Sequence, residues 1–176
     1  MNTLPFSTPR LNVGPLTPDP GPTLLMQIPE LLSPRATRHL PSGWQGIHTE
    51  DASRSWLSER QAEGQLMAVR LRGTDELVGL LMLSNTTRVQ TGLTLHLGYV
   101  LAERWWGQGL ASELVSGLAE WCQMDGRVSA LIGGVVRDHA ASVKVLEKSG
   151  FEPVEVETAP ETVQFFERRF TSPPVS

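Results

Sequence analysis

Residues 97–113 read LGYVLAERWWGQGLASE, and this stretch decides the fold. The stretch overlaps a run, Leu93 to Leu101, in which Leu, Leu, Leu, Tyr and Leu occupy every second position, the period of a half-buried strand. A turn with Gly107 and Gly109 follows, and apolar residues then recur from Leu110 with the spacing of one helix face. The stretch therefore predicts a strand that passes through a glycine turn into a helix.

The glycine turn suggests anion binding. Glycines let a backbone approach a ligand closely, and a helix N-terminus offers unpaired N–H groups and the positive end of a dipole. Together they can bind a phosphate or pyrophosphate without a basic side chain. The lysine that ends a Walker A loop and the third glycine of a dinucleotide fingerprint are both absent. From the glycines alone, a tight turn with only a structural role remains an alternative interpretation.

The flanking segments extend this pattern into an α/β domain. Residues 65–72 and 77–84 are apolar runs on either side of a Gly-Thr-Asp-Glu turn and predict a hairpin. Residues 128–136 predict a buried strand, and the unit 93–136 should form a right-handed strand–helix–strand crossover. A second helix is expected over residues 140–149.

The remaining elements have weaker signals. Asp138 can cap the second helix and Gly150 can end it. A closing hairpin is expected over 154–156 and 163–170. In the proline-rich first third we predict a strand and two helices, at residues 10–13, 23–32 and 50–61.

Composition fits a globular protein. The 176 residues are 40% hydrophobic and 19% charged, with a formal net charge of −4 and no basic run, so no nucleic-acid partner is expected. The only cysteine, Cys122, lies in an apolar helical pattern and is interpreted as a reduced core residue. No secretory signal or membrane-spanning run is visible, so a cytoplasmic protein without a membrane partner is expected. We predict one domain over residues 1–170, a flexible tail over 171–176, no metal site, and a monomer or homodimer.

Two residue groups resemble a known family. Gly98-Tyr99, followed by residues 106–113 (WGQGLASE), has the spacing of a motif in the GNAT superfamily of N-acetyltransferases, in the form found in the RimJ/RimL branch of ribosomal-protein N-terminal acetyltransferases. His139-Ala140-Ala141-Ser142, followed by residues 145–151 (VLEKSGF), resembles the second motif of that branch. Arg10-Leu11 resembles its first strand. The similarity is strong over residues 93–151 and thin before Gln65.

The chain departs from the family pattern at several positions. His139 stands where an asparagine commonly contacts coenzyme A, and Glu103 replaces a proline that we expect the turn to tolerate. The tyrosine acid of many members would fall at Leu146, and Ser142 is the replacement used by this branch.

The resemblance implies an α/β GNAT fold: a mixed, mostly antiparallel central sheet, splayed between its fourth and fifth strands, with helices on both faces. It also implies direct acetyl transfer from acetyl-CoA to a primary amine in a ternary complex. The residues expected to bind coenzyme A are Tyr99, Val100, Leu101, Trp106, Gly107, Gln108, Gly109, Leu110, Ala111, Ser112 and His139.

Two residues are candidates for proton handling. Ser142 is expected to donate a hydrogen bond to the departing thiolate, although a serine at a helix start can also bond to backbone. His96 shares a strand face with the small residues Thr94 and Gly98, and its imidazole could accept a proton from the amine. A structural or simply exposed histidine is the alternative.

The acceptor is expected to be a weakly basic amine. At pH 7 an α-amine with a pKa near 8 is about 10% neutral, whereas a lysine amine is below about 0.1% neutral. A site without a clear carboxylate base therefore favours a protein or peptide N-terminus. An antibiotic or polyamine acceptor, a non-catalytic acyl-CoA-binding module, and an unrelated nucleotide-binding domain remain alternatives.

Overall fold

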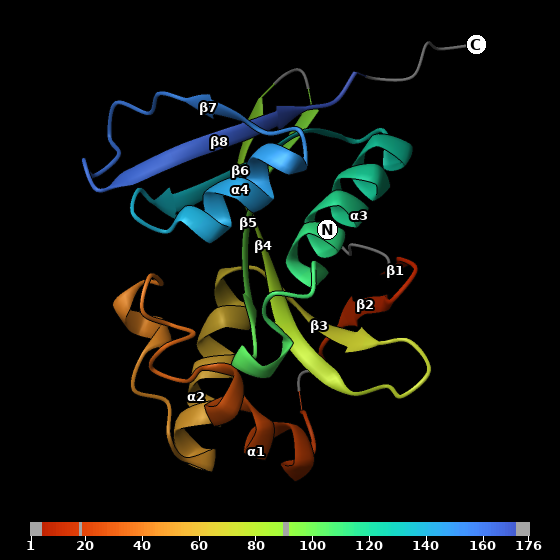
Figure 1. Ribbon diagram of the computed structural model, residues 1–176, viewed down its shortest axis with the longest axis vertical. Coiled ribbons are helices and arrows are strands. Elements are labelled where there is room, and N and C mark those ends of the chain that lie inside the picture. Colours follow the sequence, from red (N-terminus) through yellow and green to blue (C-terminus); the bar gives the residue numbers. More distant parts are fainter. Residues whose placement is uncertain (1–4, 18, 90–91, 172–176) are drawn as a thin grey trace. The chain divides into compact units, whose positions relative to one another are not determined.

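The computed structural model describes residues 5–17, 19–89 and 92–171 (Figure 1). Over these residues, eight strands form one sheet in the order β1-β2-β3-β4-β5-β6-β8-β7. The elements in chain order are β1 (Phe6–Ser7), β2 (Leu11–Pro15), α1 (Pro22–Leu31), η1 (Ser42–Trp44), α2 (Glu50–Glu63), β3 (Gln65–Leu71), β4 (Leu77–Val89), β5 (Gly92–Leu101), η2 (Glu103–Trp105), α3 (Leu110–Asp125), β6 (Val128–Val136), α4 (Ala140–Lys148), β7 (Glu152–Val154) and β8 (Val163–Arg169). None of the helices in these ranges is long and apolar enough to cross a bilayer.

Contacts divide the chain into two compact units. The first unit comprises Met1–Met82 and Tyr99–Leu110, and the second comprises Leu83–Gly98 and Ala111–Ser176. Strands β4 and β5 each contribute residues to both units. The glycine turn follows the part of β5 that belongs to the first unit.

The first unit is built on β2 and β3, which pair antiparallel from Leu11↔Leu71 to Pro15↔Met67. Helices α1 and α2 lie side by side (Figure 1) and bury their apolar sides in one cluster with residues of β3, β4 and β5. Trp44 and Trp56 meet edge to face in this cluster, with ring centroids 5.0 Å apart. Both tryptophans are therefore core residues.

Local signals set the bounds of α2. The Oγ1 of Thr49 accepts a hydrogen bond from the backbone N–H of Ala52 (3.1 Å), and Glu50 and Asp51 lie in the first turn, where acidic side chains suit the helix dipole. The helix ends at Glu63, and the N–H of its C-cap, Gly64, donates to the carbonyl oxygen of Arg60 (3.1 Å).

The second unit contains the parallel pair that the sequence predicts. Strands β5 and β6 pair from Leu93↔Val128 to Leu97↔Gly133, and β8 pairs antiparallel with β6 and β7. Helix α3 buries six residues of the predicted apolar stripe, Leu110, Leu114, Val115, Leu118, Ala119 and Cys122. The seventh, Ala111, is half-buried. The α/β class and the mostly antiparallel sheet are confirmed, whereas the splay beyond Leu97 stays a prediction.

Several boundaries differ from the predictions, among them the ends of β2 and α2, which each extend two residues further. Strand β4 continues to Val89 rather than Ser84. Strand β7 covers residues 152–154 rather than 154–156. The N-cap of α4 is His139, not Asp138, and its side chain makes no capping hydrogen bond.

The end of α4 agrees with the prediction that Gly150 follows it. Gly150 follows α4 with a φ of +79°, as a glycine after a helix end should. The single domain over 1–170 stays a prediction, and almost all of the expected tail, residues 172–176, lies outside the described residues.

Candidate functional site

The glycine turn has the backbone geometry that the sequence predicts. Gly107 and Gly109 have φ angles of +72° and +77°, in the left-handed region that other residues rarely adopt, and α3 begins at Leu110. A Cβ built on Gly107 would meet no atom within 4 Å, so open space lies beside this backbone. The first N–H groups of α3 have no partners within the helix, so the turn can present donors to an anion.

Side chains of the turn fold back onto its own backbone. The indole Nε1 of Trp106 donates to the carbonyl oxygen of Leu101 (2.8 Å), and Nε2 of Gln108 donates to that of Arg104 (3.2 Å). Trp106 is nevertheless 40% exposed, and the Arg35 guanidinium lies 5.4 Å from its ring centroid. Trp106, one of the residues predicted to bind coenzyme A, therefore holds the end of β5 and also exposes ring surface beside the turn.

Two charged residues that contact the turn were not assigned a role from the sequence. Arg10 donates from Nη1 to the carbonyl oxygen of Gln108 (2.9 Å). Glu103 accepts from the Ser33 hydroxyl (2.5 Å) and lies 3.5 Å from the Arg35 guanidinium. The resemblance of Arg10-Leu11 to the first strand of the family was the only available signal for Arg10. Glu103 was expected only to be tolerated, but it connects the turn to the segment after α1.

The end of β5 is held closely against β4. The N–H of Ala102 donates to the carbonyl oxygen of Val78 (3.0 Å). A Cβ built on Gly79 would lie 2.5 Å from Leu101 Cδ2 and closer still to the Val100 carbonyl oxygen, so this approach requires glycine. Val100 and Leu101 are buried, and Tyr99 is half-buried. The predicted pantetheine-binding segment is thus a fixed strand end.

His96 is a half-buried residue of the second unit. Its ring meets the Phe165 ring edge to face, with centroids 6.4 Å apart, and the residue is half-buried rather than part of the core. Burial lowers the pKa of the His96 imidazole below its usual 6.5. The imidazole is therefore neutral at pH 7 and able to accept a proton.

Ser142 lies in the first turn of α4, on the other side of the sheet from His96. A Cβ on Gly133 would lie 3.3 Å from Leu146 of α4 and 3.8 Å from its strand partner Leu97, so α4 covers that face. His96 precedes Leu97 and its side chain points to the opposite face, because side chains alternate along a strand. Ser142 and His139 are both half-buried.

The predicted site residues fall into two groups. Tyr99 to Leu101 and Trp106 to Leu110 belong to the first unit, where the turn brings them together. The second unit contributes His96, Ala111, Ser112, His139 and Ser142. Ala111 and Ser112 continue the turn directly into α3.

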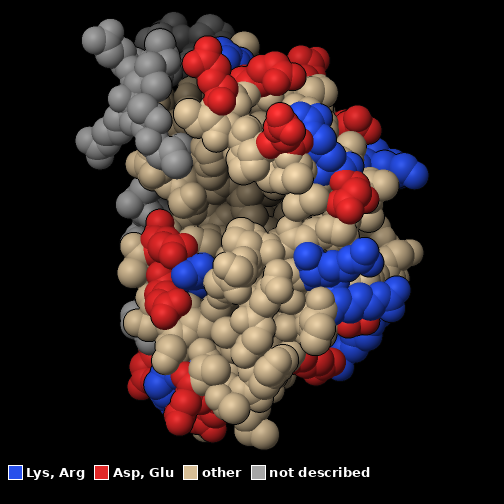
Figure 2. Space-filling model, turned by 90° about the vertical axis from the view of Figure 1, so that its left-hand side faces the viewer, with Lys and Arg blue, Asp and Glu red and all other residues tan. Residues whose placement is uncertain are grey.

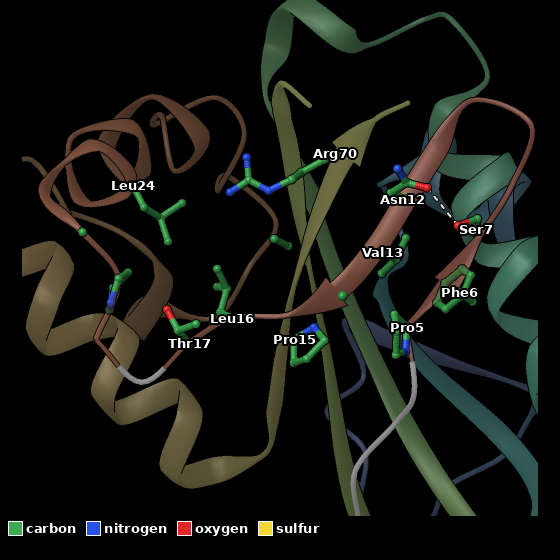
Figure 3. A pocket seen from close by; sticks show the side chains of 14 residues that line it. Pro5, Phe6, Ser7, Asn12, Val13, Pro15, Leu16, Thr17, Leu24 and Arg70 are labelled. Atoms are coloured by element: carbon green, nitrogen blue, oxygen red, sulfur yellow. Dashed lines mark hydrogen bonds between the residues drawn. The ribbon is translucent and has the colours of Figure 1, made fainter. Parts of the chain in front are cut away.

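A separate hollow of about 430 Å³ lies in the first unit, where β1, β2 and β3 meet the start of α1 (Figure 3). Arg70 and Leu24 extend into it from β3 and α1, and Ser7 bonds to Asn12 at its rim (2.8 Å). None of the predicted site residues lines this hollow. It is therefore distinct from the glycine turn.

Surface charge is mixed. On the face shown in Figure 2, Lys and Arg side chains lie beside Asp and Glu side chains rather than forming a field of one sign. Arg104, for example, pairs with Glu30 (3.0 Å) and Glu76 (2.8 Å). Beside the turn, two carboxylates therefore offset the positive charge of Arg104.

Known structures share this fold. RimL, a ribosomal L7/L12 α-N-protein acetyltransferase solved with coenzyme A, aligns with a TM-score of 0.74 and 16% identity over 95% of this chain and 97% of its own. The ribosomal-protein-S5-alanine acetyltransferase from Vibrio fischeri aligns with a TM-score of 0.69 and 16% identity, over 95% and 97%. The microcin C7 self-immunity acetyltransferase MccE, solved with acetyl-CoA and AMP, aligns with a TM-score of 0.73 and 10% identity, over 92% and 93%.

At these identities the structures establish the fold alone. A search of curated proteins by sequence finds no match. The family described as acetyltransferase (GNAT) domain, however, matches residues 10–152, which is most of the chain and includes the glycine turn, β6 and α4. The chain is an acyltransferase and belongs to the GNAT acetyltransferase family.

Proposed function

We propose that this protein transfers the acetyl group of acetyl-CoA to the α-amine of a protein or peptide N-terminus. The observation that carries the proposal is the turn at Gly107 and Gly109, whose left-handed backbone opens directly into α3. The N–H groups of residues 107–112 would hold the pyrophosphate, and the backbone of residues 99–101 would pair with the pantetheine arm. His139 would offer an imidazole donor where the family commonly has asparagine.

Acetyl-CoA supplies an activated thioester, which the neutral amine attacks directly. A backbone N–H of β5 would polarise the thioester carbonyl, as donors do in an oxyanion hole. Ser142 would donate its hydroxyl hydrogen to the departing sulfur; a serine hydroxyl is too weak an acid to protonate a thiolate outright. His96 would accept the proton that the amine releases, directly or through a water molecule.

The environment of His96 supports its role as a base. Its lowered pKa keeps the imidazole neutral at pH 7, and the half-buried ring beside Phe165 leaves part of its surface accessible. A base of this strength suits an α-amine with a pKa near 8 better than a lysine amine near 10.4. The names of two similar structures, RimL and the S5-alanine enzyme, refer to acetylation of ribosomal proteins, which agrees with this acceptor class.

A small-molecule amine is the second candidate acceptor, because MccE shares the fold and is named for self-immunity to microcin C7. One screen separates the two candidates: acetyl transfer from acetyl-CoA to N-terminal peptides, lysine peptides, polyamines and aminoglycosides. We expect turnover with peptides whose only free amine is the N-terminus. Turnover confined to a polyamine or an aminoglycoside would replace the peptide acceptor with the small-molecule one.

A further inference from the structure

Arg10 reaches the glycine turn from the opposite end of the sequence. Its Nη1 donates to the carbonyl oxygen of Gln108 at 2.9 Å, across 98 residues of chain. Its Nη2 lies 3.6 Å from the position of a Cβ on Gly109. The guanidinium thus lies against the central peptide of the turn.

The backbone that carries Arg10 is held in place on several sides. The carbonyl oxygen of Arg10 accepts from the N–H of Arg72 at 2.8 Å. The next residue, Leu11, is fully buried, and its N–H donates to Thr8 Oγ1 at 3.0 Å. Thr8 returns a hydrogen bond from its own N–H to the Leu11 carbonyl oxygen (2.9 Å). The Arg10 side chain therefore extends from a fixed backbone. This lowers the conformational entropy lost when the guanidinium bonds to the turn.

We propose that Arg10 is a positioning residue that orients the pyrophosphate-binding amides of this turn. The inference rests on the proposed function, because it takes residues 107–112 as the pyrophosphate site. The carbonyl of Gln108 and the N–H of Gly109 belong to one planar peptide and point in opposite directions. A cation fixed on the carbonyl side therefore directs the Gly109 N–H to the other side, where an anion can accept it.

The positive charge has a second effect on the same peptide. A charged donor on a carbonyl oxygen polarises the peptide and makes its N–H a better donor, since hydrogen bonds in a chain strengthen one another. Arginine also presents its N–H donors in a rigid planar fork. Lysine at position 10 would keep the charge but lose the planar fork of donors, one of which bonds to the Gln108 carbonyl oxygen. Arg10→Lys should therefore restore only part of the effect.

The test compares acetyl-CoA with S-acetylpantetheine, which lacks the pyrophosphate together with the phosphorylated adenosine. S-acetylpantetheine has the thioester and the pantetheine arm of acetyl-CoA but no pyrophosphate. Initial rates are measured for the parent, Arg10→Ala and Arg10→Lys, with both donors and the best acceptor from the screen, and calorimetry gives the Kd of coenzyme A. Arg70→Ala is the matched control, because Arg70 also donates from Nη1 to a backbone carbonyl, that of Asp75 (3.0 Å), in the turn between β3 and β4.

We expect Arg10→Ala to raise the KM for acetyl-CoA and the Kd for coenzyme A by roughly tenfold, the value of one charge-assisted hydrogen bond. Its kcat should stay within about twofold of the parent, and its kcat/KM with S-acetylpantetheine should be unchanged. Arg10→Lys should fall between the parent and the alanine variant, and Arg70→Ala should match the parent.

Three results would overturn the role of Arg10. Equal losses with both donors would mean that Arg10 only supports the fold. An alanine variant that matches the parent with acetyl-CoA would exclude any role in binding, and full rescue by lysine would exclude the planar fork. If Gly109→Val also left the coenzyme A affinity unchanged, the pyrophosphate site itself would be wrong, and the proposed function would fail separately from Arg10.

Discussion

Gly109→Val separates the cost of backbone strain from the loss of ligand binding. Gly109 has a φ of +77°, and a left-handed conformation costs a non-glycine residue roughly 1–2 kcal/mol, with more for a β-branched side chain. For a chain of this length each kcal/mol lowers the melting temperature by about 2–4 °C, so a drop of about 2–8 °C is expected. A Cβ here would lie 3.6 Å from Arg10 Nη2, an ordinary contact, so crowding adds little.

The effect on acetyl-CoA binding should be far larger. If the variant turn loses two amide hydrogen bonds to the charged pyrophosphate, each worth about 1.5–3 kcal/mol, affinity should fall by more than about 100-fold. Gly46→Val is the matched control. Gly46 has a φ of +75°, and a Cβ there would meet nothing within 4 Å, so it carries the same strain away from the turn.

Calorimetry and thermal unfolding measure the two effects separately. Both variants should lose similar stability, and only Gly109→Val should lose acetyl-CoA affinity. The reasoning is refuted if Gly109→Val binds acetyl-CoA like the parent, or if Gly46→Val loses as much affinity as Gly109→Val.

Four further variants or reagents test other features. Ser142→Ala should lower kcat about tenfold with little change in acetyl-CoA affinity, because its proposed partner is the departing thiolate; an unchanged kcat would return Ser142 to a capping role. Because burial lowers the pKa of His96, the acid limb of kcat/KM should lie below pH 6.5, and His96→Ala should remove this limb; a profile that overlays the parent would make His96 structural. Gly79→Ala should lower the free energy of unfolding by about 1–3 kcal/mol, measured in urea, because its Cβ would overlap Val100. Burial raises the pKa of the Cys122 thiol to about 12, so iodoacetamide at pH 8 should label it only after unfolding.

The parts of the fold with strong local periodicity could be predicted from the sequence. The alternation in residues 93–101 and the apolar stripe from Leu110 predicted β5 and α3, and the buried run 128–136 has the bounds of β6. Each signal lies within the element it describes, so no tertiary contact was needed to find it. The glycine turn was predictable for the same reason, since its geometry depends on Gly107 and Gly109.

Contacts between distant segments could not be predicted in this way. The bond from Arg10 to Gln108 and the bond from Ser33 to Glu103 join residues 98 and 70 positions apart. Neither partner has a local pattern that identifies the other. The cap of α4 was wrong for a different reason: side-chain chemistry favoured Asp138, but the helix begins at Ala140, as predicted, which makes His139 its N-cap.

The two edge strands of the sheet have a consequence for how the protein behaves at high concentration. An exposed edge presents unpaired N–H and C=O groups, to which a strand of another molecule can add. Here the edges are β1, with two residues, and β7, with three, and the central residue of β7 is Pro153, which has no N–H to donate. An added strand would find too few donors and acceptors to hold it. Replacing Pro153 with valine would restore a donor and a β-branched side chain at that edge, and should therefore make the native protein more prone to intermolecular sheet formation.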